Sequence, residues 1–124
     1  AVAICIYLAR QQTDKAEIRK YIEKKYRYRF IPLDVLREDY VFDSRTSYSV
    51  PPALEAFFES SSYEDAIRKA ISIGGDSDTI ACISGGIAHA YYREIPEEIY
   101  EKGMSFLDVG LRRTVKEFER RFHS

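Results

Sequence analysis

Two carboxylates and a hydroxyl group follow a pair of glycines in the segment GGDSDT, residues 74–79. Asp76 and Asp78 flank a serine, and Thr79 follows the second aspartate directly. Carboxylate and hydroxyl oxygens are the ligands that Mg²⁺ prefers, and Mn²⁺ accepts the same donors. A glycine ahead of such ligands, here Gly75, lets the backbone come close to a bound molecule. These residue types at this spacing therefore indicate a hard-cation site made by Asp76, Asp78 and Thr79.

The same aspartates also suit the start of a helix. Asp76 stands where an N-cap is expected, ahead of an apolar run, and Asp78 falls in the first turn, where a carboxylate complements the helix dipole. One side chain is enough for a cap, so capping explains a single aspartate better than two aspartates and a threonine. The structural interpretation stays open beside the metal-site hypothesis.

Three other catalytic arrangements fit this segment less well. A nucleophilic Ser77 needs a histidine base, but His89 lies about 18 Å further along the same predicted helix, and His123 is close to the end of the chain. A phosphatase-type Asp-x-Asp loop needs a buried strand before the first aspartate, whereas the residues before Gly74 keep a helical period. Cys82 and His89 are separated by about 10 Å of helix rise. All three remain minor alternatives.

The segments that must position the motif are predicted to be helices. Apolar residues recur at helical spacing in residues 1–11, 15–26 and 63–73, and Asp14 and Ser62 stand at N-cap positions. We expect further helices at residues 33–39, from Pro51 and Pro52, from Pro96 and from about Ser105. Residues 40–50 are expected to be irregular, with at most a brief extended piece. The fold class predicted is all-α, a compact multi-helix bundle.

The predicted helix after the motif carries small residues where a helix is usually strongest. Gly85 and Gly86 each cost about 1 kcal/mol relative to alanine in a helix interior. A surface of small residues allows the backbones of neighbouring helices to approach closely. We therefore expect a central helix that is packed on several sides and holds the motif at its N-terminal end.

Composition and charge exclude several classes of protein. The chain has 124 residues, 45% of them hydrophobic, and a net charge of −1, so bulk electrostatics favour neither nucleic acid nor an anionic membrane as a partner. No apolar run approaches the roughly 18 residues of a transmembrane helix. Cys5 and Cys82 have no metal-binding spacing, and we expect a reduced, cytoplasmic protein. We interpret two charged segments as structural. The first is the basic and aromatic KKYRYRF at residues 24–30, for which nucleic-acid binding is the alternative. The second is the amphipathic RRTVKEFERRF at residues 112–122, for which a partner or membrane face is the alternative.

The stretch SIGGDSDTIACISGGIAHAYY at residues 72–92, followed by IPEEI, resembles the C-terminal signature of the ADP-ribosylglycohydrolase family, which includes the dinitrogenase reductase-activating glycohydrolases. The preceding SYSVPPALEAFFESSSYEDAIRKAI is similar to the family's sequence before that signature. The resemblance covers nearly all of the chain. It implies an all-α fold with two Mg²⁺ ions, to which the C-terminal half supplies Asp76, Asp78 and Thr79.

The activity implied by the resemblance is hydrolysis of the ADP-ribose glycosidic bond. An ADP-ribosylated protein or an ADP-ribose-containing small molecule would be the substrate. The bond at the anomeric carbon of the distal ribose would break through an oxocarbenium-like state, with metal ions orienting the ribose hydroxyls and polarising the attacking water. Asp76 and Asp78 would then be catalytic as well as metal-binding. The expected substrate-binding residues are Gly75 and three residues of the loop where relatives often have Cys-Gln-Gly-Ser: Ser47, Tyr48 and Ser49.

The family's other metal ligands lie in an N-terminal half, in a Thr-Asp-Asp type motif and an early acidic site, and neither occurs in this sequence. Glu38 and Asp39 in LREDY have no threonine before them. We therefore expect residues 1–124 to be a single domain or the C-terminal half of a larger all-α glycohydrolase, inactive or nearly so by itself. A non-catalytic relative that binds or has a structural role is the alternative.

An incomplete site implies a partner, either the missing N-terminal half or a second copy of the chain. The opening segment AVAICIYLAR is apolar and begins without a cap, as the last turns of a buried helix would. A large exposed apolar surface usually marks an interface. The candidate contact residues are the apolar side chains of this first helix and the small ones of the motif helix: Val2, Ile4, Ile6, Leu8, Gly85, Gly86 and Ala90.

Overall fold

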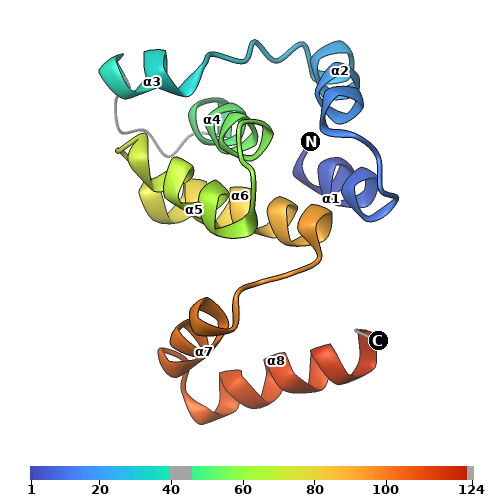
Figure 1. Ribbon diagram of the computed structural model, residues 1–124, viewed down its shortest axis with the longest axis vertical. Coiled ribbons are helices and arrows are strands. Elements are labelled where there is room, and N and C mark those ends of the chain that lie inside the picture. The colour runs from blue at the N-terminus through green and yellow to red at the C-terminus, as the bar shows by residue number, and fades with distance from the viewer. Residues whose placement is uncertain (40–45, 123–124) are drawn as a thin grey trace. The chain divides into compact units, whose positions relative to one another are not determined.

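The computed structural model describes the backbone of residues 1–39 and 46–122 and the side chains of residues 1–38 and 49–122. Within this part of the chain there are eight helices and no strand, so the predicted all-α class is confirmed (Figure 1). The chain divides into two compact units, Ala1–Glu94 and Ile95–Ser124. Each unit is described by itself below.

The first unit holds six helices and the whole GGDSDT motif. Its helix α6 packs against α1, α4 and α5, which confirms the prediction of a central motif helix (Figure 1). The smallness of Gly85 is what allows α5 to come close, because a Cβ there would lie 2.7 Å from Ile67 Cδ1. The helices are α1 (Val2–Arg10), α2 (Lys15–Tyr26), α3 (Leu33–Asp39), α4 (Thr46–Phe58), α5 (Tyr63–Ser72) and α6 (Ser77–Tyr92).

Two of the predicted helix caps are present. The Asp14 carboxylate accepts a hydrogen bond of 3.2 Å from the Ala16 N–H at the start of α2. The Ser62 hydroxyl accepts one of 3.1 Å from the Asp65 N–H at the start of α5. Each bond satisfies a backbone donor that has no partner inside its helix. The starts of α2 and α5 therefore follow from local sequence alone.

The start of α4 differs from the prediction. The helix begins at Thr46, ahead of Pro51 and Pro52, so residues 46–50 are helical and not irregular. Neither proline has a backbone N–H to donate to the helix, but the fixed φ of proline is compatible with a helical conformation. The run from Pro52 to Phe57 is buried, and this burial outweighs the lost hydrogen bonds. The remainder of the segment predicted to be irregular, residues 40–45, lies outside the described residues.

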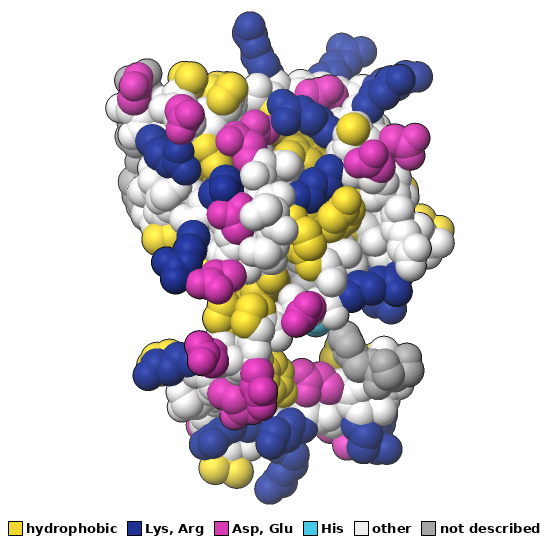
Figure 2. Space-filling view, in the orientation of Figure 1, with side chains coloured by type: hydrophobic (Ala, Val, Ile, Leu, Met, Phe, Trp, Pro, Cys, Tyr) yellow, Lys and Arg dark blue, Asp and Glu magenta, His cyan; other side chains and the backbone are white. Residues whose placement is uncertain are grey.

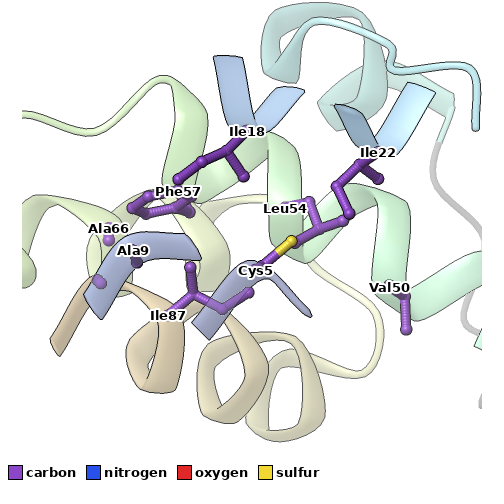
Figure 3. Packing of buried hydrophobic residues seen from close by; sticks show 10 residues of the cluster. Cys5, Ala9, Ile18, Ile22, Val50, Leu54, Phe57, Ala66 and Ile87 are labelled. Atoms are coloured by element: carbon purple, nitrogen blue, oxygen red, sulfur yellow. The ribbon is translucent and has the colours of Figure 1, made fainter. Parts of the chain in front are cut away.

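One core cluster joins five helices of the first unit. In Figure 3 the side chains of Phe57, Ile18, Leu54 and Ile87 come together from α4, α2 and α6. The apolar residues of α1 that were expected to form an interface, Val2, Ile4, Ile6 and Leu8, are half-buried against this cluster, and Gly85 is fully buried. These residues therefore expose less apolar surface than the sequence suggested. The members of the cluster are Cys5, Ala9, Ile18, Ile22, Val50, Leu54, Phe57, Ala66, Ile87 and Ala88.

The second unit is a pair of helices, α7 (Glu97–Ser105) and α8 (Val109–Phe122). The predicted start of α7 after Pro96 is confirmed, whereas α8 begins at Val109 and not near Ser105. The reason is local: the Ser105 hydroxyl donates back to the Lys102 carbonyl, and Asp108 Oδ1 accepts 2.8 Å from the Leu111 N–H. Four apolar residues of α8 repeat at helical spacing, and all but Val115 are exposed: Leu111, Val115, Phe118 and Phe122.

Candidate metal centre

The motif lies on a tight turn between α5 and α6. Gly74 and Gly75 have φ values of +85° and +67°, a left-handed conformation that glycine adopts without steric cost. The Gly74 N–H donates to the Ile71 carbonyl at 3.2 Å, and the Ser77 N–H donates to the Gly75 carbonyl at 2.9 Å. The two glycines thus allow α5 to end and α6 to begin within four residues.

Buried side chains hold this turn from both sides. Ile73 precedes the glycines and Ile80 lies in the first turn of α6, and both belong to a second core cluster. The cluster draws on α3, α4, α5 and α6, so the position of the turn is set by four helices. A site on such a rigid support keeps its geometry better than one on a free loop. The other members of the cluster are Leu33, Ala53, Ala56 and Ala70.

Asp76 occupies the N-cap position of α6 but does not cap the helix. Its side chain accepts no hydrogen bond from the first turn, although its backbone carbonyl accepts 3.0 Å from the Ile80 N–H. Asp14 and Ser62, at the equivalent positions of α2 and α5, both make the bond. The side chain of Asp76 is also nearly buried, with 9% of the residue exposed. A carboxylate in this place without a capping role is unexpected from helix formation alone.

Asp78 faces Asp76 across the first turn. Their carboxyl groups are within hydrogen-bonding reach, and this contact lowers the pKa of Asp78 below its ordinary value. The Thr79 N–H, which donates to Asp78 Oδ1 at 2.9 Å, lowers it further. Asp78 is exposed, and its lowered pKa keeps it ionised at neutral pH. The Thr79 hydroxyl makes no hydrogen bond with a described residue, so its lone pairs are available.

The three predicted metal ligands are therefore brought together at one helix end. The two carboxyl groups are in contact, and the protein occupies few of their oxygens. Two negative charges at this distance repel each other, whereas a divalent cation bound between them would stabilise both. They fall short of a full set, because Mg²⁺ takes about six ligands. Among the described residues, no group of three or more His, Cys, Asp or Glu side chains is arranged to hold a metal ion.

The predicted substrate-binding residues are only partly described. Gly75 is exposed on the turn, next to Asp76. Ser49 lies in the N-terminal part of α4 and is buried, with 2% of its surface exposed. The side chains of Ser47 and Tyr48 lie outside the described residues, although the backbone places both in the first turn of α4 and not in a loop.

The rival catalytic arrangements gain no support. Ser77 and His89 lie near opposite ends of α6, and the His89 ring lies edge-on to Tyr63, with centroids 6.5 Å apart. His123 is outside the described residues. The segment before Gly74 is the helix α5, so the strand required for a phosphatase-type loop is not there. Cys82 is exposed on α6 and remains a full two turns from His89.

The nucleic-acid alternative for residues 24–30 also gains no support. The rings of Tyr26, Tyr28 and Phe30 pack against the core and against one another, which is the structural interpretation of residues 24–30. Figure 2 shows Lys and Arg side chains interspersed with Asp and Glu over the visible face. Among the described residues, none of the helices combines the length and the apolar character needed to cross a bilayer.

One buried ionisable cluster was not anticipated from the sequence. Glu55 of α4 is almost completely buried and lies beside Arg19 of α2 and Glu59 of its own helix. The only signal in the sequence is a glutamate inside the apolar run from Ala53 to Phe58. That position is unusual for a charged residue, since glutamate is seldom buried without a partner.

The sequence model of the ADP-ribosylglycohydrolase family matches residues 3–122. An uncharacterised protein of Archaeoglobus fulgidus is 39% identical over 61 residues, which cover 48% of this chain and 20% of that protein. The matched part thus spans about a fifth of the length of this relative. No solved structure matches the chain. With a family match over nearly its whole length and the all-helical fold that the family's signature implies, the chain belongs to the ADP-ribosylglycohydrolase family.

Proposed function

We propose that the chain supplies Asp76, Asp78 and Thr79 to a two-magnesium site that hydrolyses the glycosidic bond of ADP-ribose. Membership of the family supports this proposal, because the family is generally metal-dependent and acts on ADP-ribose-related substrates. The observation that carries it is the Asp76 side chain, which stands at a helix N-cap and makes no capping bond. Its oxygens are directed to no backbone donor and remain available to a cation.

The chain's own residues have definite roles in this proposal. Asp76 and Asp78 provide carboxylate oxygens, and the lowered pKa of Asp78 keeps that group ionised at neutral pH. Thr79 adds a hydroxyl oxygen from the same turn. Mg²⁺ bound there would orient the ribose hydroxyls and polarise a water molecule for attack at the anomeric carbon. Gly75, exposed on the turn next to Asp76, is the proposed substrate contact beside these ligands.

The number of ligands bears on whether the chain acts alone. Three side-chain ligands are about half of what Mg²⁺ requires, and a two-metal site needs more. The proposal therefore includes a second source of ligands, for which the N-terminal half of the family fold is the candidate. A second copy of this chain is the other candidate, since it would bring the same three groups.

The test is Mg²⁺-dependent release of ADP-ribose from an ADP-ribosylated protein and from an ADP-ribose-containing small molecule. We expect no measurable release by the chain alone, and release on mixing it with a separately expressed N-terminal half of a family member. Chelation of Mg²⁺ by EDTA should abolish the release. If the chain alone releases ADP-ribose and Asp78→Ala abolishes this release, the proposal that its metal site is incomplete is refuted.

The second candidate is a non-catalytic relative that keeps the fold for binding or structure. It is favoured by the lack, among the described residues, of a complete acidic cluster for a metal. A chain of this kind would stay inactive with the N-terminal half present and would not bind Mg²⁺. Binding of Mg²⁺ without any hydrolysis would separate loss of catalysis from loss of the metal site.

A further inference from the structure

One face of α8 in the second unit carries a row of apolar side chains that α7 leaves uncovered. Four of them follow one another at spacings of four, three and four residues, which places them on the same side of the helix: Leu111, Val115, Phe118 and Phe122. Val115 is half-buried, whereas the other three are more than half exposed. The rings of Phe118 and Phe122 lie against each other, with centroids 4.8 Å apart. This apolar row is a continuous surface about three helical turns long.

The second unit has little apolar core of its own. Met104 is the one side chain that is buried among the described residues of this unit. Two short helices with so small a core are marginally stable, and compact units below about 40 residues usually depend on a disulfide, a metal or a partner. No cysteine occurs in residues 95–124, so no disulfide within the unit is available. A partner that covers the apolar row would supply the missing buried surface.

The net charge of the second unit bears on the kind of partner. Residues 95–124 contain six Lys and Arg and six Asp and Glu, so the positive excess on α8 is balanced by acidic residues of α7 and of the turn before α8. A unit without net charge exerts no strong attraction on an anionic lipid surface or on nucleic acid. A second copy of this chain offers the same apolar row and is likewise neutral in this unit. The charge balance therefore favours self-association.

The charged residues beside the row distinguish the two possible orientations of a second copy. The spacing of the row is that of a coiled-coil seam, in which the residues that flank the seam select partner and orientation. If two copies of α8 pack antiparallel, Arg112 of each copy lies opposite Glu119 of the other. A parallel arrangement would place Glu119 beside Thr114 and leave Arg112 without an acidic partner. In the single chain Arg112 makes no ion pair with a described residue, and Glu119 accepts only one hydrogen bond from a described residue, 2.8 Å from Tyr100 Oη.

We propose that the apolar row of α8 is a self-association surface, on which α8 of a second copy packs antiparallel. Leu111 then lies opposite Phe122 of the second copy, and Val115 opposite Phe118. The row spans only two heptads, so the dimer is weak, with a dissociation constant of about 10–100 μM. At the low micromolar concentrations of unfolding experiments the chain is then largely monomeric. This surface does not depend on the proposed hydrolase activity.

Sedimentation equilibrium of the whole chain over a concentration series tests the proposal by a charge exchange between two copies. In Arg112→Glu, and separately in Glu119→Arg, like charges face each other in the dimer, so each variant should dimerise about tenfold more weakly than the unmodified chain. An equimolar mixture of the two variants should recover the affinity of the unmodified chain, because each helix then meets one of opposite charge. Glu119→Arg also loses the hydrogen bond from Tyr100. The control Tyr100→Phe removes that bond alone and should dimerise normally.

A charge placed inside the row provides the second measurement. Phe118→Asp should weaken the dimer at least about 100-fold, whereas Val35→Asp, the same kind of change at a similarly exposed residue of α3, should leave it unchanged. An unmodified chain that is monomeric at every concentration, a dimer that Phe118→Asp does not affect, or a mixture of charge variants no tighter than either alone would each overturn the proposal. Binding to vesicles of phosphatidylserine and phosphatidylcholine without dimerisation in solution would equally overturn it, in favour of a lipid surface.

Discussion

Asp76→Asn is expected to reduce Mg²⁺-dependent release of ADP-ribose by at least about 100-fold, measured with the N-terminal half of a family member present. The variant replaces a charged metal ligand with a neutral amide of the same size. Its free energy of unfolding without metal should change by less than about 1 kcal/mol, because the Asp76 side chain makes no capping bond and asparagine is a good N-cap. The rate of ADP-ribose release and the free energy of unfolding from chemical denaturation are measured on the same preparation.

The matched control is Asp14→Asn, which makes the same change of charge at the N-cap of α2. Asp14 does cap its helix, through the Ala16 N–H, and asparagine preserves that bond. We expect this variant to keep both its stability and its activity. If Asp76→Asn instead unfolds the chain with no metal present, the Asp76 carboxylate is needed for the fold itself, and the assignment of Asp76 as a metal ligand loses its support.

Phe57→Ala is expected to cost about 3–5 kcal/mol of unfolding free energy. Phe57 is fully buried in the cluster that joins five helices of the first unit, and its ring lies 5.4 Å from that of Tyr91 and 5.1 Å from Lys15 Nζ. Because small domains are stable by only about 5–15 kcal/mol, such a loss removes much of the margin of this unit. Thermal unfolding followed by circular dichroism measures it.

Phe118→Ala provides the comparison for this prediction. Phe118 is 56% exposed on α8, so the same truncation should change stability by less than about 1 kcal/mol. An unchanged melting transition in Phe57→Ala would mean that the cluster in Figure 3 does not hold the first unit together.

The parts of the fold that were predictable depend on local signals. The caps at Asp14 and Ser62 are each specified by a few neighbouring residues, and both are present as expected. The central place of α6 was predictable for a similar reason, because small residues such as Gly85 indicate close packing. The GGDSDT motif itself was recognisable because its ligand types follow one another in the chain.

The parts that were not predictable depend on contacts between distant segments. The start of α4 at Thr46 results from burial of the helix against its neighbours, which outweighs the local signal of Pro51 and Pro52. The cluster of Glu55 with Arg19 joins residues of two helices, and only the fold brings them together. The further metal ligands that we propose lie outside the motif, and no local signal in the sequence identifies them.

The assignment of Asp76, Asp78 and Thr79 as metal ligands is tested most directly by electron paramagnetic resonance of bound Mn²⁺, which accepts the same ligands as Mg²⁺. Mn²⁺ is titrated into the chain mixed with the N-terminal half, and free Mn²⁺ is measured from its six-line spectrum. We predict saturable binding that Mg²⁺ competes away and that falls at least about 100-fold in the double variant Asp76→Asn, Asp78→Asn, while Asp14→Asn binds normally. Equal Mn²⁺ binding by the double variant and the unmodified chain would contradict the assignment.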